Sequence, residues 1–84
     1  MKYLKFQASW CSPCKQLAPI MEQVKQHGIK VEEIDVDDQS DLAEKYNIRS
    51  IPTVILTDDK GREINRLIGV KTLNEYIENY NKNR

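Results

Sequence analysis

Two cysteines separated by two residues form the one cluster in this sequence that could carry out redox chemistry. Cys11 and Cys14 are the only cysteines among the 84 residues, and they lie in the segment Trp10-Cys11-Ser12-Pro13-Cys14-Lys15. A single turn of helix would bring two sulfur atoms at this spacing together. Such a pair can close as a disulfide and open again as a dithiol, so the spacing predicts a thiol-disulfide redox site.

Cys11 is the predicted nucleophile of this pair. A thiolate, not a thiol, attacks a disulfide, so the attacking cysteine needs a pKa below the free value of about 8.5. At the N-terminus of a helix, unpaired N–H groups and the positive end of the helix dipole stabilise an anion, and Lys15 one turn along adds a positive charge. Cys14, expected to be the more buried of the two, would then resolve the mixed disulfide.

Metal binding is the main alternative chemistry for the same residues. Cys11, Cys14 and His27 could be zinc ligands, but a structural zinc site needs four ligands, and the sequence has no second C-x-x-C pair. The acidic cluster Asp35-Asp37-Asp38 lacks the glycine and the terminal glutamate of a calcium-binding loop. We therefore expect no metal, and no cofactor other than a redox-active disulfide between Cys11 and Cys14.

Length, charge balance and the distribution of apolar residues limit the kinds of protein that this sequence can encode. Eighty-four residues predict one small domain, residues 1–84. Thirteen basic and thirteen acidic residues cancel, so nothing indicates the basic surface of a nucleic-acid-binding protein. The sequence opens without a signal-peptide core and has no apolar run long enough to span a bilayer. We expect a monomeric, cytoplasmic protein without a membrane partner, and in a reducing compartment a lone C-x-x-C is seldom a permanent structural disulfide.

A strand followed by a helix should hold the two cysteines. Apolar residues alternate from about Lys2 to Ala8, which is typical of a strand. A helix is expected from near Cys11 to His27-Gly28, because proline is tolerated in a first turn. Pro19, inside the helical pattern, predicts a bend but not an end.

The remaining residues predict three more strands and two more helices. The strands are expected at residues 31–36, 52–56 and 63–68, and the helices at 39–46 and 72–80. The strand at 31–36 follows the first strand through one helix, so the two should be parallel, and its charged residues suit a sheet edge. The turn residues Asp58 to Gly61 predict an antiparallel hairpin. Thr72 and Glu75 form a predicted capping box, and the chain should fray from Asn81.

These elements give an α/β fold in the order β-α-β-α-β-β-α. A βαβ half is joined through the short helix to a ββα half. The four strands can form a mixed sheet in the order 2-1-3-4, with helices on both faces.

The combined pattern resembles the thioredoxin family. The likeness is carried by Trp10 to Lys15 directly after a strand, by Ile51-Pro52-Thr53 at the start of a later strand, and by Gly69 just past the last strand. The family's N-terminal strand and helix have no counterpart here, so we expect a minimal member whose second strand is an edge. The resemblance implies a thioredoxin-like fold and a protein-disulfide reductase that acts on disulfide-containing target proteins, with thioredoxin reductase or the glutathione system as reductant.

The resemblance also implies a substrate-binding surface around Cys11. Its expected members are Trp10, Ser12, Pro13, Ile51, Pro52, Gly69 and Val70. By resemblance the bond before Pro52 is cis, which leaves the backbone of Ile51 free to pair with an extended target segment, while Gly69 keeps the surface open. Ser12 stands where the family usually has glycine, which predicts a modest shift in reduction potential. The alternative is that Ile51 and Val70 are simply core residues.

The sequence departs from the family beneath the cysteines. Six residues before the first cysteine the family usually has a buried aspartate, and this sequence has Lys5; where the family has a lysine on the neighbouring strand, this sequence has Glu33. One hypothesis is a reversed ion pair that tunes Cys14. The other is that the region is wetter here and that Lys5 reaches solvent without a catalytic part.

Two other functions remain open at this point. Glutaredoxin-like activity, in which glutathione reduces the pair, fits the size of the chain, although Trp10 and Lys15 favour the thioredoxin pattern. A non-catalytic binding subunit with the same fold would not need Cys11 and Cys14 at all. Removing both cysteines separates this last hypothesis from a redox function.

Overall fold

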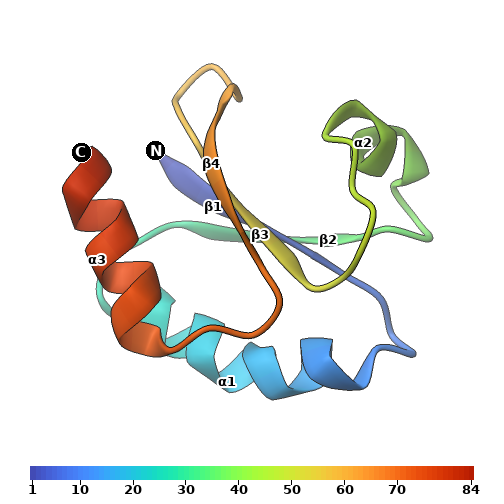
Figure 1. Cartoon of the computed structure of the whole chain (residues 1–84), viewed down its shortest axis with the longest axis horizontal. Coiled ribbons are helices and arrows are strands. Elements are labelled where there is room, and N and C mark those ends of the chain that lie inside the picture. The colour runs from blue at the N-terminus through green and yellow to red at the C-terminus, as the bar shows by residue number, and fades with distance from the viewer.

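The seven secondary-structure elements follow one another in the order that the sequence predicts (Figure 1). The structure is a computed structural model that describes residues Met1–Arg84. The elements are β1 (Lys2–Gln7), α1 (Ser12–Gln26), β2 (Val31–Asp35), α2 (Ser40–Lys45), β3 (Thr53–Thr57), β4 (Glu63–Ile68) and α3 (Leu73–Asn83). None of these helices is both long enough and apolar enough to cross a membrane.

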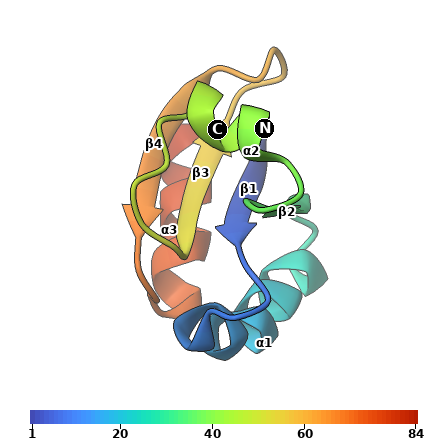
Figure 2. The same ribbon diagram turned by 90° about the vertical axis from the view of Figure 1, so that its right-hand side faces the viewer.

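The four strands form one mixed sheet in the order β2-β1-β3-β4, as predicted. β1 pairs with β2 in parallel and with β3 antiparallel, and β3 pairs antiparallel with β4. The C-terminal ends of β1 and β4 and the start of β3 therefore lie at the same end of the sheet (Figure 2). This is the end at which the chain leaves β1 and enters α1.

Helices cover both faces of the sheet (Figures 1 and 2). α1 and α3 lie on one face, where Leu17 and Tyr76 pack with Tyr3 of β1. α2 lies over the other face, where Tyr46 just after the helix packs with Phe6 and Ile55. β1 is therefore a central strand buried on both faces, because its neighbouring side chains point alternately into the two layers.

α1 packs against the sheet through one apolar stripe. Leu17, Met21 and Val24 recur at three- and four-residue spacing and are almost fully buried. The helix passes through Pro19 without ending, caps at His27, and leaves through a left-handed Gly28 with φ of 84°. This stripe fixes the position of the helix N-terminus that carries the cysteines.

Most element boundaries lie within one residue of those predicted, and two of the differences have an identifiable physical cause. β3 begins at Thr53 and not at Pro52, because proline has no N–H to contribute to the ladder. α3 continues to Asn83, where fraying was expected from Asn81. The side chain of Asn83 donates a 2.7 Å hydrogen bond to the carbonyl of Asn79. The side-chain amide of Asn79 in turn donates a 3.0 Å hydrogen bond to the Tyr3 hydroxyl.

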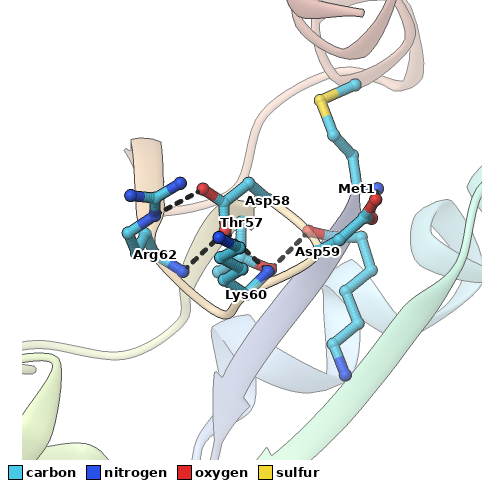
Figure 3. Close-up of polar contacts among 7 residues, drawn as sticks. Met1, Thr57, Asp58, Asp59, Lys60 and Arg62 are labelled. Atoms are coloured by element: carbon cyan, nitrogen blue, oxygen red, sulfur yellow. Dashed lines mark hydrogen bonds and ion pairs between the residues drawn. The ribbon is translucent and has the colours of Figure 1, made fainter.

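The hairpin between β3 and β4 is closed by one carboxylate (Figure 3). Asp58 accepts hydrogen bonds of 2.9 Å from the backbone N–H groups of Lys60 and Arg62, and from the guanidinium of Arg62. These bonds lower the pKa of the Asp58 carboxyl, the bond from the Arg62 N–H most of all. The amino group of Met1 lies 2.8 Å from the neighbouring Asp59, so β1 is tied to this loop at the end of the sheet away from the cysteines.

Candidate active site

Cys11 and Cys14 form a disulfide at the N-terminus of α1. Their Cα atoms are 5.2 Å apart, within the range of protein disulfides. Cys11 is the N-cap residue of the helix, and its sulfur accepts the N–H of Cys14 at 3.2 Å. The sulfur of Cys11 therefore occupies the place where helix N–H groups and the helix dipole stabilise negative charge.

The expected difference in burial between the two cysteines is absent. Cys11 is 4% exposed and Cys14 is 3% exposed. Ala8, Val36 and Ile51 pack around the pair, so the first cysteine is covered as well as the second. The two cysteines therefore differ in position and not in burial, since Cys11 is the N-cap of the helix and Cys14 lines a cavity that Cys11 does not line.

The segment before β3 approaches the disulfide from the neighbouring strand. Ile51 is half-buried and packs on the cysteine pair, and the bond between Ile51 and Pro52 is cis. The N–H of Gly69, with φ of 86°, donates a 2.9 Å hydrogen bond to the carbonyl of Pro52. The structure thus brings Ile51, Pro52 and Gly69 together beside the cysteines.

Exposed apolar side chains surround this buried disulfide. Trp10 is 67% exposed and Val70 is 38% exposed, so neither is an ordinary core residue. Ser12 and Pro13, which form the first turn of α1, are also exposed. Such a rim of exposed apolar groups beside a reactive pair can contact an extended peptide.

Asp37 is a member of the site that the sequence pattern does not predict. Its carboxylate accepts a 2.9 Å hydrogen bond from the indole N–H of Trp10, which fixes the ring although most of the ring is in solvent. In the sequence, Asp37 stands out only as part of the acidic cluster Asp35-Asp37-Asp38, which lacks the features of a calcium-binding loop. The sequence could have indicated this contact, because Trp10 follows β1 and Asp37 follows β2. The carboxyl ends of two paired parallel strands lie at the same edge of a sheet.

Asp37→Ala should release the Trp10 ring. We expect its kcat/KM for a protein disulfide to fall about fivefold, near the 1 kcal/mol contributed by a typical hydrogen bond. Trp10 is the only tryptophan, so the anisotropy of its fluorescence reports the ring's motion and should decrease. Asp38→Ala removes an adjacent exposed carboxylate and serves as the matched control. Equal effects of the two substitutions would show that the indole bond does not matter.

Lys5 and Glu33 face each other beneath the disulfide. They are paired in the register between β1 and β2, and the Lys5 Nζ lies 3.9 Å from Oε2 of Glu33. Lys5 is only 1% exposed, so protein covers nearly all of this side chain, although the cavity that it lines opens to solvent. The face that carries it is covered by α1 and α3. Burial lowers the pKa of the Lys5 amino group, although the Glu33 carboxylate partly opposes this, and Lys25 adds to the lowering.

A zinc site built on the cysteines and His27 is incompatible with the fold. His27 caps the C-terminal end of α1, whereas the cysteines lie at its N-terminal end. The 15 residues of this helix separate the two ends by about 22 Å. No group of three or more histidine, cysteine, aspartate or glutamate side chains is arranged to hold a metal ion.

A family model, related sequences and solved structures all place this chain in the same family. The family model described as Thioredoxin matches residues 2–82. A thioredoxin of Chlamydia caviae is 37% identical over 76 residues, which cover 88% of this chain and 74% of the relative. A thioredoxin of Bacillus subtilis is 38% identical over 80 residues, covering 92% and 76%. Among solved structures, a mutant thioredoxin from Halobacterium salinarum superposes with a TM-score of 0.82 at 34% identity, covering 93% of this chain and 72% of the other.

Proposed function

This chain belongs to the thioredoxin family of thiol-disulfide oxidoreductases, and on that premise we propose that Cys11 attacks target disulfides and Cys14 resolves the product. The observation that carries the proposal is the position of Cys11 at the N-cap of α1, where its sulfur accepts the Cys14 N–H. An anion at this sulfur would be favoured by the same N–H and by the helix dipole. Cys14 is not at the N-cap position, because it lies inside the first turn of α1.

The proposed cycle accounts for every electron, proton and sulfur–sulfur bond with the two cysteines and the target alone. The thiolate of Cys11 attacks one sulfur of the target disulfide, and the other target sulfur leaves with the electron pair and takes up a proton. The thiolate of Cys14 then attacks the sulfur of Cys11, which closes the Cys11–Cys14 disulfide and releases the second target thiol. The target gains two electrons and two protons, and the protein becomes oxidised. A reductant must then reopen the pair.

The target is proposed to lie as an extended segment across the rim of the site, defined here as Trp10, Ile51, Pro52, Gly69 and Val70. Trp10 and Val70 are exposed, Ile51 and Gly69 are half-buried and Pro52 is buried, so the rim offers apolar contact beside the buried sulfur atoms. Ile51 lies outside β3, and its N–H and carbonyl take part in no hydrogen bond of the chain. Both groups can therefore pair with the backbone of a target, as strands do when they bind at a sheet edge.

Thioredoxin reductase is the proposed reductant, because the relatives that match most of this chain are thioredoxins. The test is to follow insulin disulfide reduction with NADPH and thioredoxin reductase in one series, and with glutathione and its reductase in another. We expect turnover at least about tenfold faster with thioredoxin reductase, since that enzyme must recognise the surface around Cys11. Faster turnover with glutathione would instead support the glutaredoxin-like alternative.

We propose that the protein acts as a cytoplasmic monomer. β2 is an edge strand whose Glu32 and Glu33 are exposed, and such charges oppose edge-to-edge pairing with a second copy. A reductase cycle needs a reducing compartment, where a disulfide of this kind is reopened after each turnover.

A further inference from the structure

Lys5 is the only charged side chain that the fold buries. Removing an ammonium group from water is costly unless the group is fully paired. The pairing here is incomplete, because Oε2 of Glu33 lies 3.9 Å from the Lys5 Nζ, beyond hydrogen-bonding distance. Glu33 is itself 44% exposed and is shared with Lys25 of α1, at 4.0 Å. The Lys5 ammonium therefore has no hydrogen-bonding partner in the protein and retains only slight contact with solvent.

The side chain of Lys5 shares a cavity with Cys14. The cavity has a volume of about 290 Å³, lies between the start of α1 and strands β1 and β2, and opens to solvent. Four charged residues line it, namely Lys5 from β1, Glu33 and Asp35 from β2, and Lys15 from α1. Cys11 does not line it, so only the second cysteine can experience the cavity directly.

We propose that the buried ammonium group of Lys5 stabilises the thiolate of Cys14 and so accelerates the resolving step. The inference rests on the proposed function, in which Cys14 must lose a proton before it attacks Cys11. The thiol proton passes to solvent in the cavity, and the negative sulfur that remains is held by the positive charge beneath it. The sulfur of Cys14 then bonds to Cys11, and the target sulfur leaves with the electron pair and is protonated.

Lys5 should dominate the charges around Cys14 because it is the least screened. Two cations and two anions line the cavity, so their simple sum is zero. Lys15 is exposed, Glu33 is 44% exposed, and the Asp35 carboxylate accepts the N–H groups of Asp37 and Asp38. Water weakens the field of exposed charges far more than that of a buried one.

The experiment compares Lys5→Met with the native chain in two measurements. In a Cys11→Ser background, thiolate absorbance against pH gives the pKa of the lone Cys14. In the intact site, a mixed disulfide of Cys11 with a small aromatic thiol is prepared, and release of the thiol gives the resolving rate. We expect Lys5→Met to raise the pKa of Cys14 by about 1 and to slow release about tenfold at pH 7.

Matched variants separate this effect from a change in structure. Lys2→Met removes the same charge from the far end of β1 and should leave both measurements unchanged. Glu33→Gln removes the opposing carboxylate and should shift the pKa of Cys14 downward. Lys5→Arg should restore most of the resolving rate. Lys5→Gln provides a second neutral variant if the methionine variant does not fold.

The inference fails if both neutral variants fold and leave the pKa of Cys14 and the release rate at native values. In that case the native chain would still reduce target disulfides, and the proposed function would stand. If the native chain itself forms no mixed disulfide at Cys11, the proposed function fails instead. The two failures are therefore distinguishable in the same set of samples.

Discussion

Cys14→Ser should trap the protein in a covalent complex with its target. The variant keeps Cys11, so attack on the target disulfide proceeds, but no second thiol is present to close the disulfide. The resolving thiol acts inside the same molecule at a very high effective concentration, so its loss should lower steady-state turnover by at least about 10³-fold. Mass spectrometry under non-reducing conditions should show one target molecule bound through Cys11.

Cys11→Ser is the matched control for this trap. It keeps Cys14, which lies inside the first turn of α1 and lines the cavity away from Cys11. We expect no adduct and no turnover, since Cys14 then has neither a partner nor access to the target. An adduct of equal yield at Cys14 would contradict the assignment of Cys11 as the nucleophile.

Leu17→Ala should remove a large part of the stability of the fold. Leu17 is fully buried where α1 packs on the sheet. Truncating a buried leucine costs about 2 to 5 kcal/mol, because apolar contact is lost and a cavity remains. A domain of this size has a free energy of unfolding of roughly 4 to 13 kcal/mol. The urea midpoint should therefore fall sharply, together with activity at temperatures where the native chain is folded.

Gln16→Ala is the control for that substitution. Gln16 is exposed on the same turn of α1, and alanine is a good helix former, so its urea midpoint should change little. A midpoint for Leu17→Ala equal to that of Gln16→Ala would contradict the conclusion that the apolar stripe holds the helix that carries the cysteines.

The element order and the strand order were predictable from the sequence because the local signals agree with one another. Alternating apolar residues, a hairpin at Asp58 to Gly61 and a capping box at Thr72 each predict one element, and all are present. The end of α3 was not predictable in this way. It depends on Asn79, which bonds to Tyr3 across 76 positions of the sequence, and short-range propensity carries no information about such a contact.

The position of Lys5 shows what local patterns miss beneath the site. In an alternating strand a lysine is usually read as part of a solvated face, but β1 is central and both of its faces are covered. The burial of Lys5 depends on α1 packing over this part of the sheet, which is decided by tertiary structure. The cysteines and the segment Ile51-Pro52, by contrast, carry their own sequence signals, and the structure brings them together.

The most direct test of the proposed function is a single-turnover reaction between the fully reduced protein and excess insulin, with no reductase present. We predict that insulin thiols and the Cys11–Cys14 disulfide form together, with two insulin thiols for each disulfide closed, as measured by thiol titration and by the mass of the peptide that contains both cysteines. Formation of the same amount of insulin thiol by a protein carrying both Cys11→Ser and Cys14→Ser would contradict it.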